Sequence, residues 1–240
     1  MFQRKTRPQA SYLFPNSEIG AERRFHLVNL LFENQDVLQL CHDTIFLAIR
    51  LVDRYSSKKA VPQGSLYFYY GVCLLISSKY IERRENIPKL DKKDWVLYGV
   101  KDWDVESVER DILETLEYTV GRPLLTEFAW MELPKQERTK QTMDMVLYLC
   151  KLTLFDPGFV PVPSNVVARS IVAAARLALR LPPKPILTDE AHYELVWQVL
   201  FLLFRGLEQL PRTLFDEYKR PENSFVAVIL NHRLSNFNTL

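Results

Sequence analysis

The stretch of sequence that decides the fold is VPQGSLYFYYGVCLLISSKY, residues Val61 to Tyr80. It is apolar for eleven residues, from Leu66 to Ile76, and contains one charge, Lys79. A helix that is apolar all round lies inside a protein or a membrane, and a membrane span needs about twenty such residues. We therefore expect the central buried helix of a bundle, with Pro62 in its first turn, where a missing N–H is tolerated.

Two charged residues stand out against the apolar pattern. Lys79 lies in the last turn of this helix, where any lysine can neutralise the helix dipole. Glu109 lies in DVESVERDILETLEY, residues 104–118, which has Asp104 as a good N-cap. At about 100° per residue, Glu109 falls in the middle of an apolar arc, where a carboxylate is costly unless it is paired. Either Glu109 meets an internal Arg or Lys, or both residues are polar points on an apolar docking surface.

Size and charge narrow the classes of function. The 240 residues allow one large domain or two small ones, and an apolar fraction of 48% is enough for a sizeable core. The 31 basic and 29 acidic residues nearly cancel, so a formal charge of +2 gives no strong attraction to nucleic acid or to an anionic membrane. We expect another protein or a small molecule as partner, not nucleic acid or membrane.

Motifs for catalysis or metal binding are absent from the sequence. Cys41, Cys73 and Cys150 lie in apolar helical patterns without metal-ligand spacing, which predicts buried thiols in a reducing compartment. Phosphate loops, HExxH and GxSxG are missing, and the four histidines are scattered. We predict no catalytic residue, cofactor or metal site, and enzymatic activity is a minor hypothesis.

The second half repeats the first in outline, which indicates duplication of a helical unit. Val61-Pro62 begins one central helix and Val162-Pro163 begins another, and Gly121-Arg122-Pro123 marks the linker between the units. The other expected helices cover about Gly20–Glu33, Val37–Tyr55, Asp91–Val100, 104–118, Thr139–Phe155, Ser164–Leu181, His192–Gly206 and Arg212–Lys219.

Four ordered motifs resemble those of cyclins, specifically the mitotic A and B branch. They are DTIFLAIRLVDRY (Asp43–Tyr55), LLISSKY (Leu74–Tyr80), VERDILETLEYTVGRPL (Val108–Leu124) and LFDEYKRPENSFVAVILN (Leu214–Asn231). The resemblance covers about residues 20–231. It implies an all-α fold of two tandem five-helix cyclin boxes at 20–121 and 122–220, with an N-terminal arm at 1–19 and a C-terminal tail at 221–240.

The resemblance also implies a function. The chain is expected to be the regulatory subunit of a cyclin-dependent protein kinase, which it activates by docking on the kinase αC helix and so controls the cell cycle. Lys79 and Glu109 would reach main-chain groups beside αC. The apolar contacts and rim charges implied around them are Ile76, Tyr80, Leu113, Tyr118 and Val120, with Glu82 and Arg110 at the rim.

Two alternatives remain at this point. One is a cyclin-fold interaction protein that binds without activating a kinase, and the other is a module like the transcription factors of this fold. The near-neutral charge disfavours the nucleic-acid version, and the presence of both Lys79 and Glu109 disfavours loss of kinase binding.

The substrate-docking patch of this branch departs from the family pattern. The residues Arg23-Arg24-Phe25-His26-Leu27 keep Arg24 and Leu27 but have Arg and His where the family has Met and Ile. Leu30 stands where the family has Trp, a natural binding hot spot, while Glu33 keeps the acidic position. A working patch that recruits kinase substrates or inhibitors is therefore the less favoured alternative.

The N-terminus MFQRKTRPQASYLF is basic but lacks the apolar core of a secretion signal, so we expect the nucleus and cytoplasm. Only some twenty residues precede the first expected helix, and no Lys-Glu-Asn destruction motif is present. We expect a cyclin not controlled by an N-terminal destruction signal of its own, or a chain that lacks its first exon.

Overall fold

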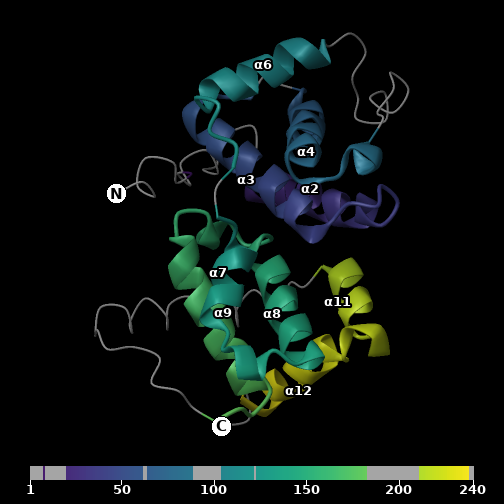
Figure 1. Ribbon diagram of the computed structural model, residues 1–240, viewed down its shortest axis with the longest axis vertical. Helices are drawn as coiled ribbons and strands as arrows, with labels where there is room; N and C mark the ends of the chain where they lie inside the picture. The colour runs from purple at the N-terminus through teal and green to yellow at the C-terminus, as the bar shows by residue number, and fades with distance from the viewer. Residues whose placement is uncertain are drawn as a thin grey trace. The chain divides into compact units, whose positions relative to one another are not determined.

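A computed structural model of the chain describes residue 8 and residues 20–61, 64–88, 104–121, 123–182 and 211–237. Across these ranges the regular structure is helical and contains no strand, which confirms the predicted all-α class. Contacts divide the chain into two compact units, Met1–Leu124 and Leu125–Leu240 (Figure 1). The division falls beside the predicted linker, and the finer domain boundaries stay predictions.

In the first unit, α3 and α4 pack side by side and form its centre, while α2 packs on α3 and α6 lies across both central helices (Figure 1). The helices of this unit are α2 (Ala21–Gln35), α3 (His42–Lys58), α4 (Leu66–Ile81), the short 3-10 helix η2 (Arg84–Asn86) and α6 (Val105–Thr115).

The central helix α4 is buried along most of its length, as its sequence predicts. Phe68, Val72 and Cys73 are at most 1% exposed, because the helix has apolar residues on every side and is covered by α3 and α6. Ser77 donates back to the Cys73 carbonyl at 2.8 Å, which satisfies a hydroxyl that would otherwise be buried without a partner. The helix begins at Leu66, and Pro62, expected in its first turn, lies outside the described residues.

The connection from α2 to α3 corrects one expected boundary. A helix was expected from Val37, but Val37 is 77% exposed in a turn, and Gln39 has a positive φ of 53°. The Gln35 amide donates to the Leu40 carbonyl at 3.1 Å and stabilises this turn. The chain therefore leaves α2 through a tight turn, and α3 begins only at His42.

The Asp53-Arg54-Tyr55 sequence near the end of α3 joins three parts of the first unit. Asp53 accepts two hydrogen bonds of 2.9 Å from the Arg24 guanidinium on α2. Arg54 donates to the backbone after α6, and the Tyr55 hydroxyl donates to Asp111 on α6 at 2.6 Å. The side chains of these three residues thus hold the neighbouring elements against α3.

In the second unit, α9 packs against α7 and α8, and α12 packs across α8 and α9 (Figure 1). The helices of this unit are α7 (Leu125–Glu132), η3 (Lys135–Glu137), α8 (Lys140–Thr153), η4 (Pro157–Phe159), α9 (Ser164–Ala178), α11 (Arg212–Tyr218), η6 (Pro221–Asn223) and α12 (Val226–Phe237). The expected helices Asp91–Val100 and His192–Gly206 lie outside the described residues.

A buried lysine links α8 to α11 in the second unit. The Lys151 side chain is 1% exposed, and its ammonium donates to both Glu217 oxygens at 2.9 and 3.2 Å. It also lies 5.0 Å from the centre of the Tyr218 ring, within the range of a cation–π contact. Tyr218 stacks on Tyr148 with ring centres 4.9 Å apart. Pairing with Glu217 makes the buried charge tolerable.

The cysteines partly follow expectation. Cys73 and Cys150 are buried, but Cys41 is exposed because it precedes the first turn of α3 and does not lie inside a helix. None of the helices in the described ranges is long and apolar enough to cross a membrane.

Candidate partner-docking site

Lys79 and Glu109 form an ion pair between the end of α4 and the first half of α6. The Lys79 ammonium donates to both Glu109 carboxylate oxygens, at 2.8 and 2.7 Å. The side chains are 46% and 19% exposed, so the pair lies at the surface. Glu109 therefore meets an internal Lys, as one alternative predicted, and the pair remains accessible to a partner.

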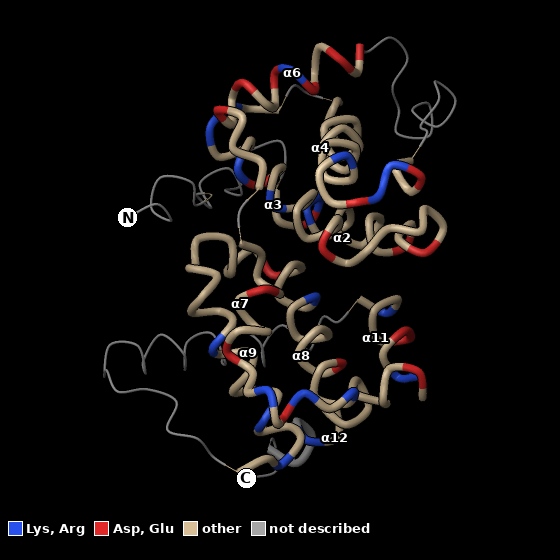
Figure 2. The backbone as a smooth tube through the Cα atoms, viewed as in Figure 1, with Lys and Arg blue, Asp and Glu red and all other residues tan. Residues whose placement is uncertain are grey.

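The local sequence explains why these two residues meet. Asp104 caps α6 by accepting from the Glu106 N–H at 3.1 Å. Val108 and Ile112 are buried against the rest of the unit and fix the rotation of α6. Figure 2 shows charged residues distributed along α6, whereas α4 is uncharged until its last turn, at Lys79. Lys79, the one charged residue of α4, thus lies beside the Glu109 carboxylate of α6.

Asp111 anchors α6 to α3 on another side. It accepts from the Lys59 ammonium and the Tyr55 hydroxyl, both at 2.6 Å. Burial alone would raise the pKa of Asp111, but these two hydrogen bonds outweigh it and lower the pKa below its ordinary value. This anchor therefore stabilises the fold at neutral pH and is lost as the pH falls through the lowered pKa.

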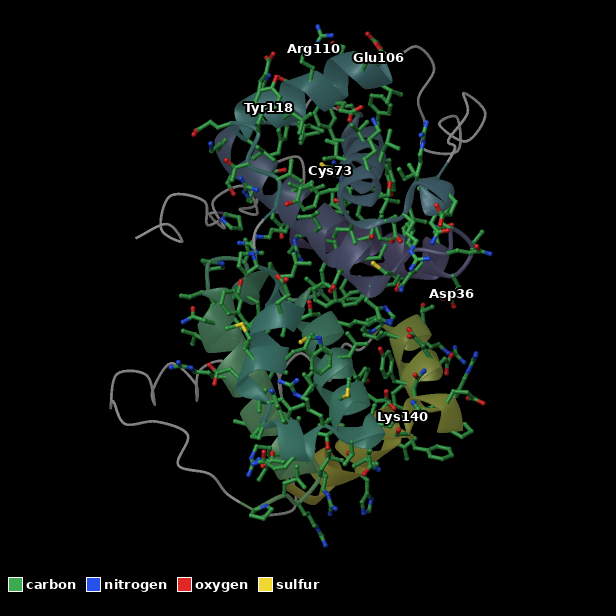
Figure 3. All side chains as sticks on the ribbon, in the orientation of Figure 1. Asp36, Cys73, Glu106, Arg110, Tyr118 and Lys140 are labelled. Atoms are coloured by element: carbon green, nitrogen blue, oxygen red, sulfur yellow. The ribbon has the colours of Figure 1, made fainter. Side chains whose placement is uncertain are left out.

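Two exposed aromatic rings accompany the ion pair. Tyr80 follows Lys79 and is 61% exposed, and Tyr118 lies in the turn after α6 and is 65% exposed (Figure 3). Among the other predicted apolar contacts, Ile76 is buried, while Leu113 and Val120 are half-buried. Exposed tyrosines beside a charged pair are typical of binding surfaces, because their rings provide large apolar area with a polar end.

Gly121 makes room for Tyr80. A Cβ atom at position 121 would overlap the Tyr80 hydroxyl and ring, so the tyrosine lies directly over the backbone at the end of this turn. From the sequence, Gly121 is identified only as part of a linker. Its lack of a side chain lets Tyr80 approach the segment that carries Tyr118 and Val120.

Glu82 and Arg110, the predicted rim charges, have different surroundings. Arg110 is exposed on the outer side of α6 (Figure 3). Glu82 reaches the start of α3, where one oxygen accepts from the Cys41 N–H at 2.7 Å and from the Thr44 hydroxyl at 2.5 Å. It therefore acts as an N-cap from a distance, because it satisfies a backbone donor at a helix start.

We expect Glu82→Ala to lower the free energy of unfolding by about 1 kcal/mol, the usual effect of losing an N-cap. Glu82→Gln keeps an accepting oxygen and should recover most of that loss. Chemical denaturation of both variants measures the difference. Equal stability of Glu82→Ala and the unchanged chain would contradict the capping role.

The predicted substrate-docking residues on α2 do not form one exposed cluster. Arg24 is 2% exposed and bound to Asp53, and Leu27 is also buried. Leu30 is half-buried, and Glu33 is exposed and accepts from Asn29 at 2.7 Å. The substrate-docking role of these residues stays a prediction, with Leu30 and Glu33 the two that reach the surface.

No group of His, Cys, Asp and Glu side chains that could hold a metal ion occurs within the ranges that the structure describes. The arrangement of this surface, an ion pair with two exposed tyrosines, is suited to contact with a protein.

Sequence comparison identifies the family. A family model for the cyclin N-terminal domain matches residues 2–121, half of the chain. The chain belongs to the cyclin family. This cyclin is of the A/B type, because curated A- and B-type cyclins are among its relatives.

Three of these relatives illustrate the similarity. Cyclin-A3-1 of Oryza sativa subsp. japonica is 30% identical over 192 residues, 76% of this chain and 50% of that protein. G2/mitotic-specific cyclin-A of Patella vulgata is 28% identical, covering 79% and 45%. Putative cyclin-B3-1 of Arabidopsis thaliana is 24% identical, covering 91% and 57%. This cyclin thus spans about half the length of the curated relatives that it matches.

Solved structures share the fold. The viral cyclin from herpesvirus saimiri superimposes with a TM-score of 0.60 at 16% identity, over 79% of this chain and 88% of that one. A chain of the yeast RNA Pol II CTD kinase CTDK-1 complex gives a TM-score of 0.58 at 14% identity, over 77% and 65%. Because these matches extend through both units, they support the predicted fold of tandem cyclin boxes.

Proposed function

We propose that this cyclin is the regulatory subunit of a cyclin-dependent protein kinase, which it binds and activates in controlling the cell cycle. The observation that carries the proposal is the surface ion pair between Lys79 and Glu109, in the same unit as two exposed rings, those of Tyr80, next to Lys79, and of Tyr118, in the turn after α6. A yeast kinase complex among the structural neighbours supports a kinase as the class of partner. The cyclin itself performs no catalytic step in this proposal.

The proposed mechanism is a shift of the kinase between two states. A protein kinase holds the ATP phosphates correctly only when its β3 Lys is paired with the Glu of helix αC. A surface that binds αC in its inward position favours that state, by as much as the difference in affinity for the two states. A shift from 1:99 to 99:1 requires about 5.5 kcal/mol, which an interface of roughly 1,600 Å² with a few hot spots can supply.

The ion pair suits this role because it is already formed in the free chain. Lys79 and Glu109 hold each other at 2.7–2.8 Å, so their side chains lose little conformational freedom when a partner binds. Lys79 still has donor capacity for a backbone carbonyl, and Glu109 has lone pairs for a backbone N–H.

The test mixes the purified chain with an inactive cyclin-dependent kinase and measures co-elution and phosphorylation of histone. We expect the unchanged chain to bind and activate, and Lys79→Ala with Glu109→Ala to lose both while melting at nearly the same temperature, because exposed pairs contribute at most about 1 kcal/mol. A matched control is Arg169→Ala with Glu132→Ala, which removes an ion pair of 2.9 Å in the second unit.

Each result separates the alternatives. Binding without activation supports an interaction protein that does not switch the kinase on. No binding to any kinase tested contradicts the proposal. Equal loss of binding in the control pair would contradict the assignment to the Lys79 surface. As part of the same proposal we place the protein in the nucleus and cytoplasm, which imaging of a tagged chain would test.

A further inference from the structure

Three cations on α3 bind the last residue of α6 and the segment that follows it. The cations are spaced four residues apart, which places them on one face of the helix, and the carbonyls that they bind are also four residues apart. The segment therefore runs antiparallel to α3. The hydrogen bonds are Lys58 Nζ to the Thr115 carbonyl at 3.1 Å, Arg54 Nη1 to the Thr119 carbonyl at 2.6 Å and Arg50 Nη1 to the Pro123 carbonyl at 2.7 Å. We call these three cations the α3 ladder.

The segment that the α3 ladder binds contains an unfavourable turn. Glu117 and Tyr118 both have positive φ angles, 54° and 52°, a region that L-residues other than glycine rarely adopt. The Glu117 N–H donates to the Glu114 carbonyl at 2.9 Å and the Tyr118 N–H to the Leu113 carbonyl at 2.8 Å. These two bonds form a Schellman motif, in which glycine is the usual residue at the position of Glu117.

A turn in this conformation persists only where the surrounding structure holds it. The α3 ladder provides that restraint, because it binds a carbonyl before the turn, one just after it and one four residues further on. The same turn contains Tyr118 and continues through Val120 to Gly121. The Tyr80 side chain lies against the backbone of Gly121. Its conformation therefore sets where both exposed tyrosines project.

We propose that Arg50, Arg54 and Lys58 are positioning residues, which hold the Glu117–Val120 turn in the conformation that presents Tyr118 and Tyr80 to the kinase. The kinase part of this inference rests on the proposed function, whereas the restraint of the turn does not. Because the free chain already holds this turn in its strained conformation, less conformational entropy is lost when the partner binds.

The first test measures the turn in the free chain. Arg54 is 4% exposed, so its loss risks unfolding, but Arg50 is only half-buried and Lys58 is exposed, so these two can be replaced. We expect Arg50→Ala with Lys58→Ala to speed hydrogen exchange of the amides of residues 118–120 at least about tenfold, while the α4 amides exchange as before. Arg83→Ala with Arg84→Ala removes two exposed charges from the same unit and should leave all these rates unchanged.

The second test adds the kinase and a compensating change. If the ladder variant lowers the docking-competent population to about one tenth, its apparent dissociation constant rises about tenfold. Adding Glu117→Gly relieves the positive φ, so it should restore much of the amide protection and of the affinity. A structural role unrelated to this turn would not respond to that change.

The outcomes distinguish this inference from the proposed function. Unchanged exchange in the ladder variant overturns the inference, whether or not the chain binds a kinase. Faster exchange with unchanged kinase affinity overturns the positioning role, and failure of the unchanged chain to bind any kinase overturns the proposed function while the exchange result still stands. Failure of Glu117→Gly to restore protection overturns the part that assigns the restraint to backbone strain.

Discussion

Asp53→Ala is expected to lower the free energy of unfolding of the first unit by about 3–5 kcal/mol, the largest effect of a single substitution that we predict. Asp53 accepts both hydrogen bonds from Arg24, whose side chain is 2% exposed. Removing the carboxylate takes away the charge that binds this buried guanidinium through two hydrogen bonds. Because whole domains have only about 5–15 kcal/mol of stability, much of this unit should unfold well below its normal melting temperature.

Denaturation followed by hydrogen exchange in α3 and α4 measures this loss within the first unit. Replacing both partners, Arg24→Met with Asp53→Leu, should recover a large part of the stability, since apolar residues of similar size can substitute for a buried ion pair. Glu132→Ala, which breaks an exposed pair, should change stability by less than about 1 kcal/mol. Melting of Asp53→Ala at the normal temperature would refute the central role of the pair.

Exchanging the two charges, Lys79→Glu with Glu109→Lys, should preserve folding and strongly weaken kinase binding. The exchanged side chains can still form an ion pair across α4 and α6, with a small loss because an acidic residue in the last turn of α4 is unfavourable to the helix dipole. A partner that offers a carbonyl to Lys79 and an N–H to Glu109 would meet the wrong group at each position. We expect its dissociation constant to rise on the order of 100-fold, about 2.7 kcal/mol.

Thermal melting and titration with the kinase separate the two roles of the pair. A melting temperature within a few degrees of normal, together with lost binding, assigns the pair to docking. Normal binding by the exchanged pair would show that Lys79 and Glu109 serve the fold alone. Arg169→Glu with Glu132→Arg exchanges a pair of similar exposure in the second unit and should leave kinase binding intact.

Periodicity predicted most of the helices, but their boundaries depended on contacts that the sequence does not display. The apolar run Leu66–Ile76 predicts a buried helix from its own sequence, whichever elements surround it. The helix expected from Val37 begins instead at His42, because the chain turns at Gln39. Glu82, more than forty residues away in the sequence, caps this start of α3. A local pattern cannot include a cap supplied by a distant element.

The sequence likewise predicted residues of the candidate site, but not their partners or their burial. Glu109 was noticed because a carboxylate inside an apolar arc demands a partner, but the sequence left open whether that partner was internal. Arg24 was expected at a docking patch, and burial beside Asp53 became evident only in the folded unit. The i, i+4 spacing of Arg50, Arg54 and Lys58 was visible in the sequence, but nothing there indicated that their shared face meets backbone carbonyls.

The sequence by itself determined the all-α class, the family and the central position of α4, because these follow from hydrophobic periodicity and from ordered motifs that are local in the chain. Only the tertiary structure decided that Lys79 pairs with Glu109, that Tyr80 lies over Gly121 and that the α3 ladder holds the turn at Tyr118. Each of those contacts joins residues thirty or more positions apart. Their meeting depends on how α3, α4 and α6 pack, which no single stretch of sequence encodes.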